Sequence, residues 1–186
     1  MVVTGRPPFN AYDHDHPGGN SSIRARSGLR VDLLNPTPDM IRLSDIAHGL
    51  ANINRFGGHT ARPWSVAEHS LVVAGLLHRQ FGNDRLTLAG LLHDATEAYL
   101  GDVVRPLKQA LPEYQIIEQR MADVIAYKFF SRDTAVIDDP RVKAADELAL
   151  VFDMATIRDA TWRTPNNPDD VINAFMHQAW ITGAKF

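Results

Sequence analysis

The stretch LAGLLHDATE, residues 88–97, joins a leucine-rich helical pattern to two adjacent side chains that bind metal ions. Its leucines are typical of a helix that packs into a core, and the apolar run ends at His93 and Asp94. Imidazole and carboxylate groups both bind divalent cations, and burying them is costly unless they are paired or coordinated. The pair therefore indicates a metal site inside a helical protein, provided that other segments supply further ligands.

Helical patterns also cover most of the remaining chain. We predict helices at 45–54, 65–81, 84–100, a short one from Pro106, a longer one from Pro112, and two more at 140–159 and 169–183. Ser44 is the expected N-cap of the first helix, and Ser65 with Glu68 matches a capping box at the start of the second. Gly101 is expected to end the third. These patterns predict an all-α fold.

The N-terminal segment differs in composition from the rest of the chain. Residues 1–28 are rich in Gly, Pro, Ser, Asn and Arg without periodicity, which predicts a flexible tail. It contains His14, Asp15 and His16, but short runs of this kind on flexible arms seldom hold a metal specifically. Residues 29–34 are expected to form a short extended arm or hairpin. We therefore predict a tail, 1–28, and one domain, 29–186.

Composition excludes several classes of site and partner. The chain has no cysteine, which rules out disulfides and thiolate sites and leaves His, Asp and Glu as the strong metal ligands. The formal net charge of −3 provides no basic field for duplex nucleic acid. No segment approaches the roughly 18 apolar residues that span a membrane, and the N-terminus lacks a signal-peptide pattern. We expect a cytoplasmic protein.

Four residues form the predicted ligand set: His69, His93, Asp94 and Asp146. Each lies in a predicted helix beside small or apolar neighbours, and helix bundles commonly build metal sites from side chains that project inward from separate helices. Taken singly, such a histidine is more often an ordinary core residue and such an aspartate is more often exposed. The ordered set on separate helices of a cysteine-free chain favours a metal site.

The ordered set H…HD…D resembles the pattern of HD-domain metal-dependent phosphohydrolases, and further segments resemble their 5′-deoxynucleotidase-like branch, which includes phage and prophage members. These segments are an HDxxE…GD stretch at 93–102, a Pro-x-Lys element at 106–108, an Asn-Arg-aromatic element at 54–56 and a Glu-His-Ser element at 68–70. The similarity covers roughly residues 29–155. It implies an HD-domain helical bundle that holds one divalent metal ion, whose identity among Mn, Co, Fe, Ni, Zn and Mg the sequence leaves open.

Glu97 is the expected catalytic residue. It lies three residues after Asp94 on roughly the same helix face, where a carboxylate can act as general base or acid toward water or the leaving oxygen. The resemblance also places the family's catalytic acid there. Without that resemblance, Glu97 would be interpreted as a surface residue near a helix end.

Five residues are the expected substrate contacts: Arg55, Phe56, His59, Asp102 and Lys108. A guanidinium can bind phosphate, an aromatic ring can stack on a base, and the resemblance implies that Asp102 meets the sugar 3′-hydroxyl. An ordinary structural role is also open to most of them, such as a helix-capping arginine, a core phenylalanine, a loop histidine without a role or a solvated lysine. Phe56 replaces the tryptophan of some relatives, which leaves base preference open.

The resemblance implies that the protein is a phosphohydrolase of deoxynucleoside 5′-monophosphates. Triphosphate hydrolysis of a dNTP is the main alternative, and it would need more cations around the pocket. The sequence also leaves open an HD phosphodiesterase or alarmone hydrolase, and a metal-stabilised binding module without activity. By analogy with nucleotidase relatives we also expect a homo-oligomer, a dimer or larger.

Overall fold

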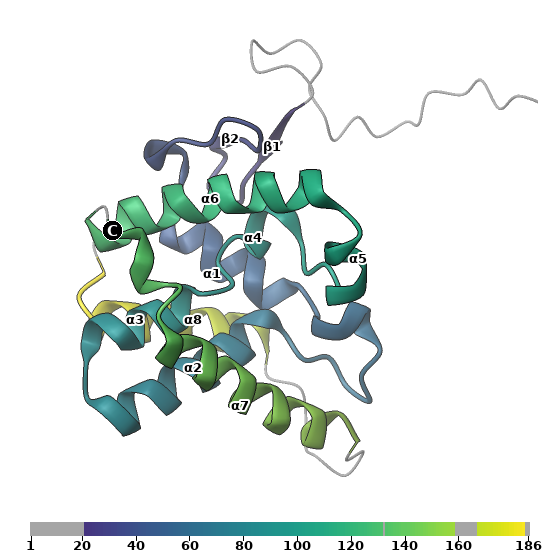
Figure 1. Ribbon diagram of the computed structural model, residues 1–186, viewed down its shortest axis with the longest axis vertical. Coiled ribbons are helices and arrows are strands. Elements are labelled where there is room, and N and C mark those ends of the chain that lie inside the picture. Colours follow the sequence, from purple (N-terminus) through teal and green to yellow (C-terminus); the bar gives the residue numbers. More distant parts are fainter. Residues whose placement is uncertain (1–20, 132, 159–166, 185–186) are drawn as a thin grey trace, which may run out of the picture.

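The computed structural model describes residues 21–131, 133–158 and 167–184. Most of the predicted tail, including His14 to His16, lies outside these ranges. The elements are, in order, β1 Ser22–Arg24, β2 Arg30–Asp32, η2 Pro38–Met40, α1 Leu43–Asn52, η3 Arg55–Gly58, α2 Val66–Phe81, α3 Asp84–Leu92, α4 Glu97–Leu100, α5 Arg105–Gln109, α6 Pro112–Phe130, η4 Thr134–Val136, α7 Pro140–Arg158 and α8 Pro168–Ile181 (Figure 1). The predicted all-α fold with a short N-terminal hairpin is confirmed.

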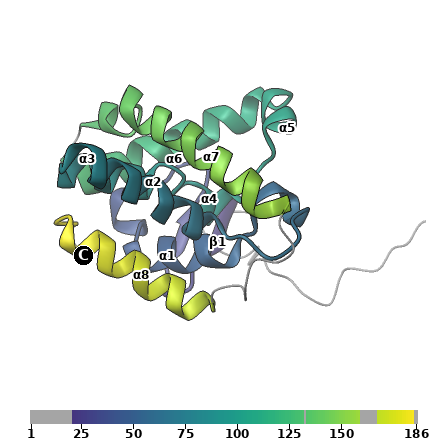
Figure 2. The same cartoon turned by 90° about the horizontal axis from the view of Figure 1, so that it is seen from below.

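Helix α2 is at the centre of the bundle. It packs against α1, α3, α7 and α8. Figure 2 shows α8 on one side of the molecule and α6 and α7 on the other, with α2 between them. Because α2 is surrounded in this way, even the polar side chain of His69 on it is fully buried. Any polar group on this face must find its partners within the protein.

The apolar side chains of the described residues form a single core. Most of its largest fully buried members come from α1, α2, α3, α6 and α8, and these include Ile46, Leu50, Leu77, Leu91, Met121, Ile125, Phe130 and Phe175. Within the described ranges, none of the helices is both long enough and apolar enough to cross a membrane.

Two predicted helix starts had different outcomes. Ser65 caps α2 as expected: its hydroxyl accepts from the Glu68 backbone N–H, and the Glu68 carboxylate accepts from the Ser65 backbone N–H. The predicted Ser44 cap is wrong, because α1 begins at Leu43 and Ser44 lies inside it. Asp45, next in the chain, accepts hydrogen bonds of 2.7 Å from both the backbone N–H and the hydroxyl of Ser27. Those bonds hold the hairpin turn against α1.

The hairpin extends into the segment predicted to be a tail. Strand β1 pairs antiparallel with β2, with Ile23 opposite the fully buried Val31. Only β2 lies within the predicted arm at 29–34. A strand of three residues is too short to show an alternating pattern, so the sequence alone does not reveal β1.

The predicted continuous helix at 84–100 is wrong. It divides into α3 and α4, with a turn at residues 93–96. In this turn the backbone N–H groups of Ala95, Glu97 and Tyr99 each donate to the carbonyl three residues earlier, at distances of 3.0 Å. Such three-residue hydrogen bonds tighten the backbone relative to an α-helix. His93 and Asp94 therefore lie at the end of α3 and not inside a regular helix.

Helix α4 packs closely on α1 at a glycine. A Cβ atom on Gly49 would lie 2.9 Å from both the Cβ and the carbonyl oxygen of Ala98. That distance is shorter than a normal van der Waals contact, so the two backbones approach in a way that requires glycine. The contact fixes α4, whose first residue is Glu97.

Candidate functional site

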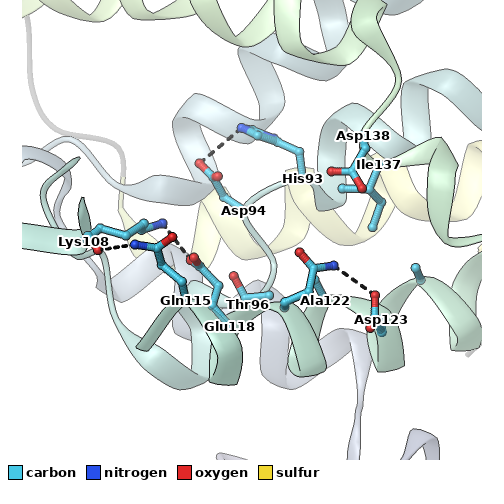
Figure 3. A pocket seen from close by; sticks show the side chains of 12 residues that line it. His93, Asp94, Thr96, Lys108, Gln115, Glu118, Ala122, Asp123, Ile137 and Asp138 are labelled. Atoms are coloured by element: carbon cyan, nitrogen blue, oxygen red, sulfur yellow. Dashed lines mark hydrogen bonds and ion pairs between the residues drawn. The ribbon is translucent and has the colours of Figure 1, made fainter. Parts of the chain in front are cut away.

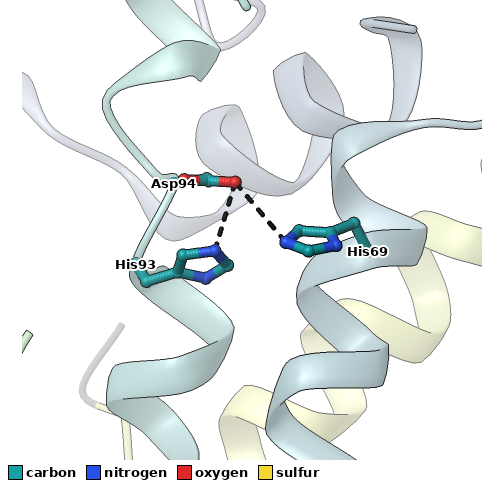
Figure 4. A group of neighbouring side chains, drawn as sticks. All are labelled: His69, His93 and Asp94. Atoms are coloured by element: carbon teal, nitrogen blue, oxygen red, sulfur yellow. Dashed lines mark ion pairs between the residues drawn. The ribbon is translucent and has the colours of Figure 1, made fainter. Parts of the chain in front are cut away.

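Two histidines and an aspartate form a compact group at the centre of the bundle. One ligand atom each from His69, His93 and Asp94 lies within 4.8 Å of the others. Figure 4 shows both imidazole rings turned toward the Asp94 carboxylate, with His69 on α2 and the other two at the end of α3. Asp94 Oδ2 lies 3.2 Å from His93 Nε2 and 3.9 Å from His69 Nε2. The sequence-predicted HD pair and His69 therefore converge.

Asp146 approaches the same group from α7. Its Oδ1 lies 2.9 Å from His69 Nε2 and 3.7 Å from His93 Nε2. All four residues of the predicted ligand set thus come together from three segments that are distant in the sequence. The turn after α3 contributes to this geometry, because neighbouring residues of a regular α-helix diverge by about 100°.

The donors of this group suit a divalent cation. His93 Nδ1–H donates to the carbonyl of Gly90 at 2.8 Å, so Nε2 is the ring nitrogen that a cation can bind once it has lost its proton. His93 Nε2 is buried, and among the described residues it makes the ion pair with Asp94 but no hydrogen bond. Imidazole nitrogens together with carboxylate oxygens are common ligands of Mn²⁺, Fe²⁺, Co²⁺ and Zn²⁺. The group can therefore hold a metal ion, which would satisfy the buried nitrogen.

The electrostatics of the group favour positive charge between the carboxylates. Burial alone would lower the pKa of His93, but the carboxylates of Asp94 and Asp146 outweigh it and raise the pKa to about 10. Burial alone would raise the pKa of Asp94 and Asp146. The neighbouring imidazoles outweigh it and hold the pKa of each carboxyl well below its usual range. A proton and a metal ion would compete for the same position at His93 Nε2.

Asp153 is a residue of the site that the sequence patterns above do not single out. It is fully buried on α7, and its Oδ2 lies 2.9 Å from His69 Nδ1 and 3.2 Å from Arg55 Nε. The sequence does contain a pattern that indicates this residue, because Asp146 and Asp153 are seven residues apart. That spacing places them two turns apart on the same face of a helix.

Glu97 is buried beside the metal-binding group. Its side chain is 6% exposed at the start of α4, and its Oε2 has no hydrogen-bond partner among the described residues. Burial, followed by the negative charges of Asp94 and Asp102, raises the pKa of Glu97 to about 9. A buried carboxyl with an unused oxygen next to a cavity is available for proton transfer.

A cavity of about 500 Å³, the substrate cavity, opens beside Glu97. It is lined by Arg55, Phe56, Asp94, Glu97, Asp102, Val103, Val104, Arg105, Pro106, Lys108, Asp146, Leu150 and Met154. The cavity is therefore lined by both charged and apolar side chains. Among the sequence-predicted substrate contacts, His59 is exposed and lies outside this lining.

Arg55 and Phe56 follow each other on the cavity wall. Arg55 Nη1 donates to Asp94 Oδ2 at 3.2 Å, and the guanidinium lies 5.4 Å from the centre of the Phe56 ring. Phe56 has a left-handed backbone conformation, with φ 58° and ψ 30°, which is uncommon for a bulky residue and is often found at functional sites. Neither side chain is a core residue or a helix cap.

Figure 3 shows the lining of a second cavity, of about 310 Å³ and named the acidic cavity. Asp94 and Lys108 line both cavities, and His93 lines the second. The rest of its lining is Thr96, Gln115, Glu118, Gln119, Ala122, Asp123, Ala126, Ile137 and Asp138. Lys108 Nζ forms an ion pair with Glu118 Oε1 at 2.7 Å. The predicted substrate contact Lys108 is thus held by a residue of α6.

Comparison with known proteins identifies several relatives of this chain. No family model matches the chain. The uncharacterized protein YfdR of Escherichia coli is 41% identical over 109 residues, which cover 59% of this chain and 58% of that protein. The 5′-deoxynucleotidase Ent638_2835 of Enterobacter sp. strain 638 is 32% identical over 108 residues, covering 48% of this chain and 54% of that protein.

A further relative matches over a longer region. The uncharacterized protein RCAP_rcc00048 of Rhodobacter capsulatus is 42% identical over 134 residues, which cover 68% of this chain and 67% of that protein. Identity of this degree over two thirds of both proteins shows common descent and a common fold. The chain therefore belongs to the family of the Rhodobacter capsulatus protein RCAP_rcc00048.

Proposed function

We propose that the protein is a metal-dependent phosphohydrolase that releases orthophosphate from deoxynucleoside 5′-monophosphates. The observation that carries this proposal is the convergence of His69, His93, Asp94 and Asp146 beside a cavity into which a buried glutamate, Glu97, is placed. The relative named as a 5′-deoxynucleotidase supports the same reaction class.

In this proposal the four ligands hold one divalent cation. Such an ion lowers the pKa of water and neutralises charge on a phosphate when it is bound. Water adds to phosphorus, the bond between phosphorus and the 5′ oxygen breaks, and the leaving oxygen takes up a proton. Glu97, three residues after Asp94 and protonated in the resting site, donates its proton to the leaving oxygen and takes one from the attacking water. Arg55 binds the phosphate through its guanidinium N–H groups.

The nucleoside would occupy the rest of the substrate cavity. A volume of about 500 Å³ lies within the roughly 300–1,000 Å³ of small-molecule sites. Asp102, on the charged part of the wall, can accept a hydrogen bond from a sugar hydroxyl. Phe56, Leu150 and Met154 offer apolar surface for a base.

The charges around the site favour a monophosphate over a triphosphate. Arg55 is assigned to the single phosphate of a monophosphate. Lys108 is paired with Glu118, and Arg62 lies over the Trp64 ring outside the cavity lining. Arg105 on the wall is exposed, where water screens its charge. Next to Asp94, the acidic cavity is lined by Glu118, Asp123 and Asp138. Further phosphates extending there would meet like charge.

The test is a substrate panel with protein loaded in turn with Mn²⁺, Co²⁺, Mg²⁺ and Zn²⁺. We expect orthophosphate from dNMPs and little or no tripolyphosphate from dNTPs. Glu97→Gln should abolish phosphate release while Mn²⁺ still binds. If the wild-type protein binds Mn²⁺ but hydrolyses no dNMP with any of these ions, the proposal is wrong, and a binding module without activity is favoured. Tripolyphosphate from dNTPs alone would favour the triphosphohydrolase.

A further inference from the structure

Asp153 is a buried carboxylate that contacts both the candidate metal centre and the candidate phosphate-binding arginine. It is fully buried, whereas Asp146 on the same helix is partly exposed. Its Oδ2 is 2.9 Å from His69 Nδ1 and 3.2 Å from Arg55 Nε. A buried charge is costly unless it is paired, and these two contacts provide the pairing.

The contact with His69 determines which ring nitrogen can bind a cation. Nδ1 faces Asp153, and Nε2 faces Asp146 and Asp94. An imidazole that binds a metal through Nε2 carries its proton on Nδ1. A carboxylate that accepts this N–H fixes both the tautomer and the rotation of the ring, an arrangement common around metal-binding histidines.

The contact with Arg55 holds the guanidinium between two carboxylates. Nε faces Asp153, and Nη1 donates to Asp94 Oδ2 at 3.2 Å. A guanidinium has five N–H groups, so these two contacts leave donors for a phosphate. Since a long arginine side chain loses conformational freedom when it is fixed, a partner that holds it in advance lowers the cost of binding a ligand.

On the basis of the proposed metal centre, we propose that Asp153 is a positioning residue with two effects. It presents His69 Nε2 to the cation, and it holds Arg55 beside Asp94 for the phosphate. The same carboxylate oxygen thereby couples metal binding to phosphate binding. Asp153 touches neither the cation nor the substrate in this proposal.

The test compares Asp153→Asn with Glu147→Gln, which removes an exposed carboxylate from the same helix. Mn²⁺ is titrated by calorimetry, followed by inorganic phosphate on the Mn²⁺-loaded protein. We expect Asp153→Asn to weaken Mn²⁺ binding by roughly 10–100-fold and to weaken phosphate binding as well. Glu147→Gln should change neither affinity. A purely structural role predicts a lower melting temperature in EDTA with an unchanged affinity for Mn²⁺, and that result would overturn the proposal.

A second measurement does not depend on the variant. ¹⁵N NMR of the wild-type protein loaded with Zn²⁺ should show His69 bound through Nε2 with its proton on Nδ1. Binding through Nδ1 contradicts the proposal even if Asp153→Asn fails to fold. Because these readouts use metal and phosphate alone, they are separate from the proposed reaction. A protein that binds Mn²⁺ through this geometry but hydrolyses no dNMP refutes only the proposed function.

Discussion

Glu97 shows how burial prepares a single side chain for its proposed role. The carboxyl is nearly enclosed and lies near Asp94 and Asp102, so its charged form is disfavoured. The pKa of about 9 is far above the ordinary value of 4.5. In the folded protein the group therefore keeps its proton at a pH where the unfolded chain has lost it.

This difference predicts a pH-dependent stability. Below about pH 4.5 Glu97 is protonated in both states, and as the pH rises toward about 9 only the folded state retains the proton, so Glu97 progressively lowers the free energy of unfolding. Glu97→Gln removes the effect. We expect the variant to gain stability relative to wild type between about pH 5 and pH 9, measured by urea unfolding in EDTA. Parallel curves for the two proteins would show that Glu97 ionises normally.

At the scale of elements, the close contact between α1 and α4 positions Glu97. Gly49→Ala would place a methyl group 2.9 Å from the Ala98 carbonyl oxygen, so α4 must move. We expect a loss of about 1–3 kcal/mol in the free energy of unfolding, together with a lower kcat. Gly75→Ala on α2 is the matched control. Nothing lies within 4 Å of the Cβ it would add, so it should stabilise the helix by up to about 1 kcal/mol.

The ion pair between Lys108 on α5 and Glu118 on α6 is placed where the substrate and acidic cavities meet. Glu118→Gln frees the lysine and removes a negative charge from the acidic cavity. We expect the ratio of kcat/KM for dNTP to kcat/KM for dNMP to rise. Glu113→Gln, at the exposed first turn of the same helix, serves as the control. A ratio unchanged in both variants would mean that the acidic cavity does not select the substrate.

The elements also show what a sequence can and cannot predict. The start of α2 is predictable because Ser65 and Glu68 satisfy each other locally. The break after α3 is not predictable, because every residue from Leu92 to Glu97 is compatible with a helix. The packing around these residues selects the turn. Asp153 is recognisable by its spacing from Asp146, but its partners His69 and Arg55 become visible only when α7 lies on α2.

At the scale of the whole molecule, the proposed cation joins three segments: α2, the end of α3, and α7. A ligand that binds only the folded state stabilises it by mass action. The free energy of unfolding rises by about 2.7 kcal/mol when the free ligand concentration is one hundred times its Kd. We expect Mn²⁺ to raise the melting temperature and EDTA to reverse the increase. His69→Ala should abolish the shift, whereas His78→Ala, an exposed histidine on the same helix, should retain it. A shift that survives His69→Ala would place the ion elsewhere.

The separation of the ligands along the chain has a consequence for folding. His69 is 77 positions from Asp146 and 84 from Asp153. Closing a loop of this length costs chain entropy, and this cost is offset only by the contacts that form when α7 docks on α2. A chain in which α7 has not docked has an incomplete ligand set and a His69 ring free to rotate. The proposed centre is therefore complete only once α7 has docked on α2, so in this proposal tight metal binding would report that the two helices have come together.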